Sequence, residues 1–560
     1  MARVEPRSIS FEELIRQVQD GVLRCPRFQR SFVWRGDQVI DFFDSIRLRY
    51  PVGSLLVWRT RERYSSFDMV GPIQVSANQP KAPAEVGYLL DGHQRLSVLF
   101  GVFALEDSAA EHLRGSDRAF LVYYDLEEEQ FKHVRFPLGH HLPVRYLLGH
   151  DDQLVAWLDE RRDATDPGTP ERARWDIFRR RANQLQTIFA QYRLPYLDVT
   201  EASLEEAVKI FVRVNSQGTS VKRAEVFAAL TWRHDGFDFS RAAKELLEQY
   251  PLFNNFGTDP ILRSLLASLG KNIYADDWER ILEEHGAELP GAMKAVGDAF
   301  GLALDFLERE IGANSGKVVP YSLHLVLLTE FFRICPGPEV YAREELKSWL
   351  WATAFSSTYT SGGNVRGHLA VERAQRLARG QTIALLPERL RLSPFPRRFH
   401  PKSARVRAFH LFLKTLRPRD LRSGELLPPG LLRNGMADAR AVITGGGQQT
   451  WRLAGRILVG AGRRPIAEDL IQLYFESCMA LGRPGIPYPE FEATLNSHVI
   501  SREALSSLSA GEFERFLELR ERDLIDRERH FAAKFVDVPG EIEVAEEPEI
   551  DVEDDSEPDL

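Results

Sequence analysis

A short apolar stretch that stops at an Asp-Gly pair is the feature that most constrains this chain. It covers residues 88–100 and reads YLLDGHQRLSVLF. Residues 88–90 predict the end of a buried strand, and Gly92 tolerates the backbone angles of a sharp turn. Leu96, Leu99 and Phe100 then recur at helical spacing, which predicts a helix that begins at about His93. The chain is therefore expected to fold around a junction where a strand passes directly into a helix.

Two side chains of opposite charge, Asp91 and Arg95, stand at this junction. The N–H groups and the positive dipole end of a helix N-terminus favour an anion, of which phosphate is the usual one. The junction is thus a candidate phosphate site. The same residues also fit an alternative, in which Asp91 caps the helix and Arg95 forms a surface ion pair.

Arginine and aromatic residues alternate in an earlier stretch, PRFQRSFVWR, at residues 26–35. Arginines beside aromatic rings suit phosphate binding and base stacking. In the alternative interpretation, the aromatic side chains belong to the core and the arginines form a solvated rim.

Strands and helices are mixed through the first 235 residues, which predicts an α+β domain. Asn215 and Gly218 lie in a loop that interrupts the last of these helices, where they either form the loop or contact a ribose or a phosphate. The pattern over 236–385 is nearly all helical and predicts a helical middle domain. Strands are expected at 54–58, 88–90, 119–125 and 194–199, and helices at 8–22, 37–50, 150–192 and 204–230.

A strongly basic stretch follows at residues 391–422, with ten Lys or Arg against one acid, Asp420. Such a density of positive charge, mixed with phenylalanines, predicts a surface that binds a nucleic-acid backbone, although a charge run is also compatible with a solvated face. The candidate DNA-binding residues are Arg398, Lys402, Arg405, Arg407, Arg417 and Arg419.

The end of the chain is strongly acidic. Residues 541–560 contain eleven Asp or Glu and no Lys or Arg, so the formal net charge of −9 becomes about +2 without them. This composition predicts a disordered tail over 537–560. The tail serves solubility or, alternatively, mimics DNA and competes for a basic groove.

Several classes of protein are excluded by composition. No apolar run approaches the roughly 18 residues of a membrane span, and the first residues lack the core of a signal peptide. Three cysteines far apart predict neither a disulfide framework nor a zinc knuckle. We therefore expect a cytoplasmic protein without membrane contact.

Three ordered motifs, PRFQRSFVW, YLLDGHQRLSVLF and FVRVNSQGTSVKRAEVF, resemble the N-terminal domain of GmrSD-type modification-dependent restriction proteins. The resemblance implies a ParB/sulfiredoxin-like α+β fold over residues 1–235. It also implies that the DGHQR loop binds and hydrolyses a nucleoside triphosphate with a divalent cation, Mg²⁺ being expected, and so regulates cleavage of modified DNA. His93 replaces the first Gln of the usual DGQQR, which adds a group that titrates near neutrality.

Site residues follow from this resemblance position by position. The catalytic residues would be Asp91, His93 and Arg95, and the nucleotide- or phosphate-binding residues Gln29, Arg30, Gly92, Gln94, Asn215 and Gly218. The metal ligands are left undefined.

The C-terminal region, 386–536, resembles a degenerate HNH-type nuclease domain of the same family. Residues 439–447 contain no His where the first catalytic His is expected, and Gly455 stands in the place of the Asn. Metal-assisted cleavage needs both an activated water and a fixed cation. We expect this domain to bind DNA without cutting it, unless His400, His410 or His498 converges with Asp438 or Glu425.

Two functions are thus predicted, beside a third alternative in which the ParB-like domain itself is the nuclease. In the first, the chain is an NTPase of a DNA restriction or anti-phage defence system. In the second, it is a non-catalytic sensor of DNA or nucleotide that recruits a partner nuclease or another subunit of the system.

Overall fold

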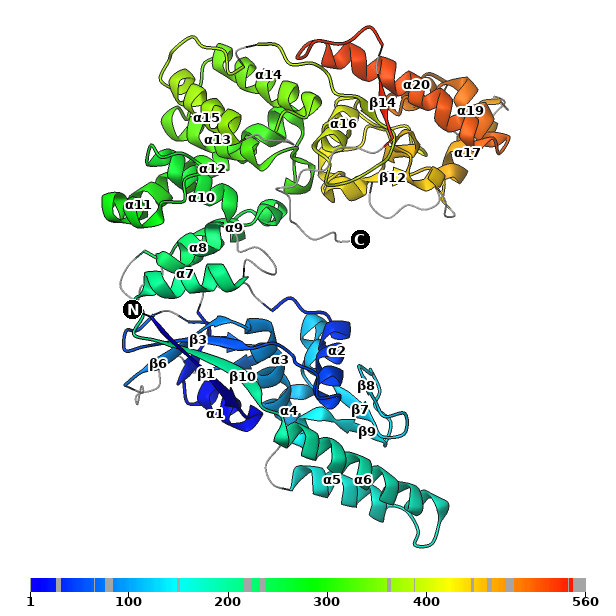
Figure 1. The fold of residues 1–560 in the computed structure, drawn as a ribbon. Helices are drawn as coiled ribbons and strands as arrows, with labels where there is room; N and C mark the ends of the chain where they lie inside the picture. The colour runs from blue at the N-terminus through cyan, green and yellow to red at the C-terminus, as the bar shows by residue number, and fades with distance from the viewer. Residues whose placement is uncertain are drawn as a thin grey trace. The chain divides into compact units, whose positions relative to one another are not determined.

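The computed structural model of the protein describes residues 2–26, 32–64, 66–75, 84–148, 152–215, 223–231, 237–359, 364–386, 388–444, 448–460, 466–478, 488–541 and 543–546. The chain divides into two compact units, Met1–Arg241 and Ala242–Leu560 (Figure 1). The first mixes strands and helices and the second is mostly helical, which confirms this part of the predicted fold class.

A five-stranded mixed sheet forms the centre of the first unit. Its strand order is β1-β10-β3-β6-β2. The pairs β10–β3 and β6–β2 are parallel, whereas β1–β10 and β3–β6 are antiparallel. The five strands are β1 (Arg3–Ile9), β2 (Leu23–Arg24), β3 (Leu55–Thr60), β6 (Val86–Asp91) and β10 (Leu194–Thr200).

Aromatic side chains join the helices of this unit into one core. Ser10 caps α1 (Phe11–Gln19), with its hydroxyl accepting from the Glu13 N–H, so the helix begins three residues after its predicted start at Ser8, which belongs to β1. The rings of Phe11 and Phe103 stack with centroids 6.2 Å apart, and Phe43 and Phe189 join the same cluster. These rings come from α1, α2 (Gly36–Arg47), α3 (His93–Phe103) and α6 (Pro170–Gln191).

A smaller antiparallel sheet, β8-β7-β9, and a helical hairpin complete the body of the unit. The predicted strand at 119–125 is only partly right, because residues Gly115–Phe120 form a 3-10 turn and the strand begins at Tyr123. The remaining elements are β4 (Met69–Val70), β5 (Ile73–Gln74), α4 (Asp107–Ala110), β7 (Tyr123–Asp125), β8 (Gln130–Lys132), β9 (His141–Pro143), the hairpin helices α5 (Gln153–Asp163) and α6, then α7 (Leu204–Asn215) and α8 (Arg223–Leu230).

The second unit consists of helices with two small sheets, β12–β13 and β11–β14. Helix α16 (Ala404–Thr415) is buried from Ala404 to Leu413 and forms part of its core, with Phe412 packed against Phe531 of α20. No described helix is long and apolar enough to span a membrane. The other elements are α9 (Phe239–Glu248), which begins at the end of the first unit, α10 (Asp259–Ser268), α11 (Trp278–His285), α12 (Leu289–Ile311), α13 (Ser322–Ile334), α14 (Val340–Ser356), α15 (Asn364–Ala378), β11 (Phe395–Pro396), β12 (Ala439–Ala441), β13 (Arg456–Leu458), α17 (Ile466–Cys478), α18 (Tyr488–Ser497), α19 (Arg502–Ser509), α20 (Phe513–Ala532) and β14 (Val544–Ala545).

Candidate functional site

The junction predicted from sequence lies where β6 passes into α3. Gly92 connects the two elements with a φ of 99°, a left-handed angle that favours glycine. A Cβ atom added to Gly92 would lie 2.4 Å from Cδ2 of Leu55 on the neighbouring strand. The left-handed backbone angle, together with the nearby Leu55 side chain, therefore favours a glycine here, and the N-terminus of α3 follows at once.

Arg95 is held in place by three groups around the junction. Its Nη2 donates to Oδ2 of Asp91 over 2.9 Å, and its Nη1 donates to the Val52 carbonyl over 3.3 Å. Nη1 also lies over Gly53, because a Cβ added there would be only 1.9 Å from it. The guanidinium is thus half-buried in a fixed orientation beside the first turn of α3.

Gln94 links this junction to the arginine- and aromatic-rich stretch of the sequence. Its Oε1 accepts a hydrogen bond of 2.9 Å from the Val33 N–H. Two motifs that are 61 residues apart along the chain therefore meet at one point.

The other predicted residues of the nucleotide site have different outcomes. His93 is buried and its ring stacks on Phe67 at a centroid distance of 5.7 Å, so it faces the interior of the unit. Asn215 is the last residue of α7, and nothing is described of its side chain. Gln29, Arg30 and Gly218 lie outside the described residues.

A surface hollow with a volume of about 680 Å³ begins beside Val33. Phe32, Trp34 and Phe120 line it, with the rings of Phe32 and Phe120 4.7 Å apart, and we call it the aromatic hollow. Charged or titratable side chains also line it, namely Arg35, Asp37, Asp117, Arg118 and His133. Phe32, Trp34 and Arg35 belong to the arginine- and aromatic-rich stretch found in the sequence. Phe120 comes from the 3-10 turn Gly115–Phe120, far away along the chain, and the sequence does not indicate that this turn joins the hollow.

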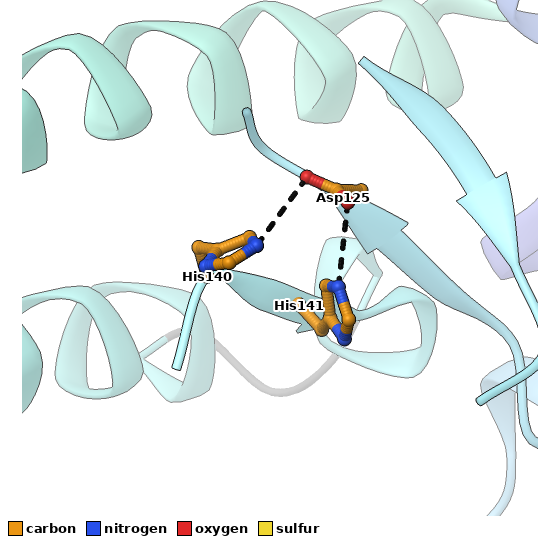
Figure 2. Close-up of side chains that lie close together, drawn as sticks. All are labelled: Asp125, His140 and His141. Carbon is orange, nitrogen blue, oxygen red and sulfur yellow. Dashed lines mark ion pairs between the residues drawn. The ribbon is translucent and has the colours of Figure 1, made fainter. Parts of the chain in front are cut away.

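A second polar cluster, missed from sequence, lies at the edge of the small sheet. Asp125, His140 and His141 are the one group of three His, Cys, Asp or Glu side chains among the described residues that is close enough to hold a metal ion. Figure 2 shows each imidazole directed at a different oxygen of the carboxylate, with Nε2 of His141 3.3 Å from Oδ2 and Nε2 of His140 3.7 Å from Oδ1. Only the pairing of β7 with β9 brings these residues together.

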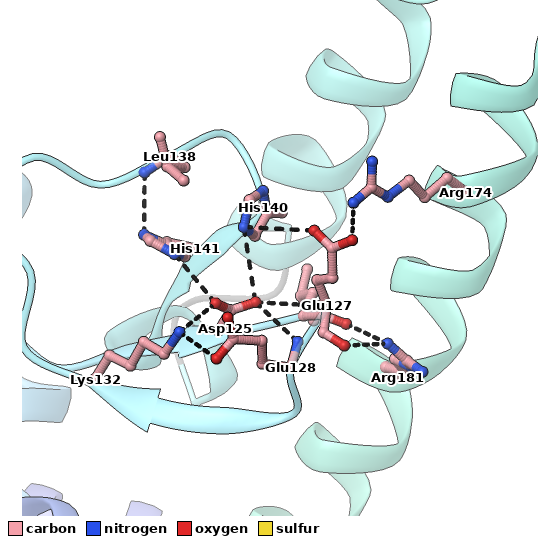
Figure 3. Close-up of polar contacts among 10 residues, drawn as sticks. Asp125, Glu127, Glu128, Lys132, Leu138, His140, His141, Arg174 and Arg181 are labelled. Carbon is pink, nitrogen blue, oxygen red and sulfur yellow. Dashed lines mark hydrogen bonds and ion pairs between the residues drawn. The ribbon is translucent and has the colours of Figure 1, made fainter.

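The wider contacts of this cluster account for its charge without a cation (Figure 3). Lys132 Nζ lies 2.8 Å from Asp125 Oδ2, and the N–H groups of Glu127 and Glu128 donate to Oδ1. Burial alone would raise the pKa of Asp125, but these donors outweigh it and hold the pKa below its usual value.

The tautomer of His141 also argues against a metal. The Leu138 N–H donates to Nδ1 of His141 over 3.0 Å, so a neutral imidazole carries its proton on Nε2 and donates toward Asp125. A ligating Nε2 would require the opposite tautomer, whose N–H would face the N–H of Leu138. The cluster therefore links β7, β8 and β9 through hydrogen bonds and ion pairs.

Two of the predicted DNA-binding arginines are in the core instead. Arg405 and Arg407 are both buried. Arg405 Nη1 and Nη2 donate to the two carboxylate oxygens of Glu528 over 2.9 and 2.5 Å. Arg407 donates to the carbonyls of Pro401 and Val319. The DNA-binding prediction is wrong for these two residues, since the groups that would contact phosphate are already enclosed and occupied.

The other four predicted DNA-binding residues reach the surface to different degrees. Arg398 and Arg417 are exposed, and Lys402 and Arg419 are half-buried. Arg419 also donates from Nη1 to the Gly424 carbonyl over 2.6 Å. The basic stretch is therefore divided between core and surface.

Three histidines, His400, His410 and His498, were candidates for a nuclease centre, and none of them belongs to a cluster of potential metal ligands among the described residues. His498 is buried and its Nε2 lies 2.8 Å from the Arg419 carbonyl, while burial lowers its pKa to about 4. His410 is also buried, and burial together with nearby Lys414 lowers its pKa well below the usual value. Within the described part of the second unit, neither belongs to a group of three potential metal ligands, and the same is true of His400.

A comparison with known families agrees with the geometry of the first unit. Residues 11–232 match the family model of the GmrSD restriction endonuclease, N-terminal domain. The first unit, Met1–Arg241, is therefore similar to that N-terminal domain over most of its length. No curated protein matches the chain. The junction, Arg95 and the aromatic hollow all lie inside the matched residues, as does the Asp125 cluster.

Proposed function

We propose that this protein belongs to a DNA restriction or defence system and that its GmrSD N-terminal domain binds a nucleoside triphosphate at the β6–α3 junction. The domain would have the ParB/sulfiredoxin-like fold that the motifs imply. Phosphate groups would lie at the N-terminus of α3 beside Arg95, and the base would enter the aromatic hollow. DNA, modified or not, would be the substrate of the system, with cleavage supplied by a partner.

The hydrogen bond between Gln94 and Val33 is the observation that carries this proposal. It joins Gln94, in the first turn of α3, to Val33, which lines the aromatic hollow. Phosphate is favoured by the helix N-terminus and the guanidinium of Arg95, and a nucleobase is favoured by the aromatic rings of the hollow. A ligand that has both parts, such as a nucleotide, fits the combination better than phosphate alone.

Each residue of the junction has a distinct role in this proposal. Gly92 lets the backbone approach the phosphates, and Arg95 neutralises their charge. Gln94 keeps the loop after the PRFQR motif against the junction. Asp91 is the carboxylate of the DGHQR loop that would hold Mg²⁺, which supplies positive charge to the phosphates when bound.

The test is a measurement of nucleotide binding and hydrolysis with and without modified DNA. Asp91→Ala and Arg95→Ala should each abolish turnover with unchanged circular dichroism. Arg3→Ala, an exposed arginine of the same unit, is the matched control and should retain full activity. Unchanged hydrolysis in either junction variant would refute the assignment.

A non-catalytic sensor is the second candidate, and the ion pair between Asp91 and Arg95 favours it. Asp91 has to share its carboxylate with this arginine, so a cation would compete with Arg95 for it. The sensor would bind nucleotide at normal affinity and show no turnover. Isothermal calorimetry and a hydrolysis assay on the same sample separate the two candidates.

For the second unit we propose DNA binding without cleavage. The exposed arginines of the basic stretch would contact the backbone, and the buried histidines would have structural roles. Binding should weaken steeply with salt, because each phosphate contact releases a counterion.

A further inference from the structure

Residues 543–546, in the acidic tail, are docked onto the basic stretch. β14 pairs in parallel with β11, with Phe395 opposite Val544 and Pro396 opposite Ala545. The Phe395 N–H donates to the Glu543 carbonyl over 2.9 Å, and the Arg397 N–H donates to the Ala545 carbonyl over 2.8 Å. The expectation of disorder from residue 537 onward is therefore wrong for this segment.

Ion pairs accompany this strand pairing. Arg397 Nη1 contacts the carboxylate of Glu546, and Arg389 Nε lies 3.3 Å from Oδ1 of Asp537. Residues 547–560 continue the sequence with eight further acids and no Lys or Arg. The described contact thus joins Glu546, which directly precedes this acidic run in the sequence, to Arg397.

The two partners of this contact differ in rigidity. Phe395 is fully buried, and its ring packs edge-on against Phe409 of α16 at 5.5 Å, so β11 is fixed to the core. Val544 and Ala545 are only half-buried, and Glu543 and Glu546 are exposed. The strand pairing is two residues long. Such a short, partly exposed contact can open while the surface beneath it keeps its shape.

We propose that residues 543–546 cover a part of the basic stretch around Arg397 that binds nucleic acid, and must be displaced before DNA binds there. The guanidinium of Arg397 and the backbone N–H groups of Phe395 and Arg397 now bind oxygens of the tail, and these are the donor types that contact phosphate oxygens. Tail and DNA backbone would therefore exclude one another. This inference rests on the DNA partner in the proposed function and adds its regulation.

Because the tail is part of the same chain as the basic stretch, its competition with DNA does not depend on the protein concentration. A tethered segment competes at an effective concentration in the millimolar range, so even a weak contact lowers apparent DNA affinity. The effect should be strongest at low salt, where both the tail and the DNA are attracted to the same charges.

The test compares DNA affinity of the full chain with that of a chain ending at Glu541, by fluorescence anisotropy. At about 50 mM salt the shortened chain should bind at least about tenfold more tightly, with the gain shrinking as salt rises. Glu546→Gln removes the ion pair and should give part of the gain. Glu541→Gln removes one charge from the same tail without that ion pair, and should leave affinity unchanged.

Hydrogen exchange supplies a second readout that does not need DNA. The amides of Phe395 and Arg397 should be protected in the full chain and exposed in the shortened one. If the full chain and the shortened chain bind DNA with equal affinity, the tail does not compete with DNA and this inference is wrong, although DNA binding itself is confirmed. If Glu546→Gln and Glu541→Gln raise DNA affinity equally, the net charge of the tail and not the ion pair of Glu546 determines binding, and the inference is wrong. If neither chain binds DNA, the proposed partner fails, and this inference fails with it.

Discussion

Arg405→Ala should destabilise the second unit strongly, although the residue belongs to the most basic stretch of the sequence. Its side chain is 4% exposed and that of Glu528 is 1% exposed. Truncation leaves a buried carboxylate without its cation, which typically costs about 3–5 kcal/mol. The guanidinium also lies over the Phe355 ring at 5.3 Å, so packing is lost as well.

Urea unfolding followed by tryptophan fluorescence can measure this effect. Trp349 and Trp351 are buried on α14, which packs against α16, and they report on the environment of the pair. With an m-value of about 3 kcal/mol/M, a loss of about 4 kcal/mol lowers the urea midpoint by about 1.3 M.

Two controls make the result decisive. Arg417→Ala removes an exposed arginine of the same stretch and should change stability by less than about 0.5 kcal/mol. Arg405→Met combined with Glu528→Leu removes both charges and should recover most of the stability lost by the single variant. Equal midpoints for Arg405→Ala and Arg417→Ala would contradict the buried ion pair, as would weaker DNA binding by Arg405→Ala at unchanged stability.

Three further predictions concern other sites. Gly53→Ala should displace the guanidinium of Arg95 and weaken nucleotide binding, as measured by calorimetry, while a strained backbone costs about 1–3 kcal/mol of stability; unchanged affinity would show that the position of Arg95 is not critical. Asp125 has a folded-state pKa below its unfolded value, so its stabilising contribution is complete above about pH 5 and is lost as the pH falls below about 4. The melting temperature of Asp125→Asn should therefore differ most from that of the native chain near neutrality and approach it in acid, and a constant difference across pH would refute the linkage. Plasmid nicking with Mg²⁺ or Mn²⁺ should be absent in the native chain, and nicking that disappears in His498→Ala would revive a nuclease.

The junction was predictable because its causes are local. A buried strand, an Asp-Gly pair and helical spacing occur within thirteen residues of each other, and the structure places β6, Gly92 and α3 there. The same reasoning assigned Asp91 and Arg95 to one site. Their hydrogen bond spans only four residues, within reach of one helical turn.

The misassigned arginines illustrate what a local pattern lacks. Arg405 and Arg407 lie on a helix that is buried from Ala404 to Leu413, and local charge density does not distinguish such a helix from an exposed one. The partner of Arg405 is 123 residues further along the chain. The Asp125 cluster was missed for a related reason, because its histidines meet the carboxylate only through strand pairing.

The edge strand β1 has a consequence for how the first unit is made. Arg3 to Ile9 pair with Thr200 to Leu194, so the first strand of the unit has its partner in a strand near the end of the same unit. The helical hairpin of α5 and α6 must be synthesised in between, and pairings of such long sequence separation form slowly. β3 and β6 are complete much earlier and can pair first. A fusion or deletion at the N-terminus should therefore delay the closing step of folding in this unit, and expression yield will respond to it before nucleotide binding does.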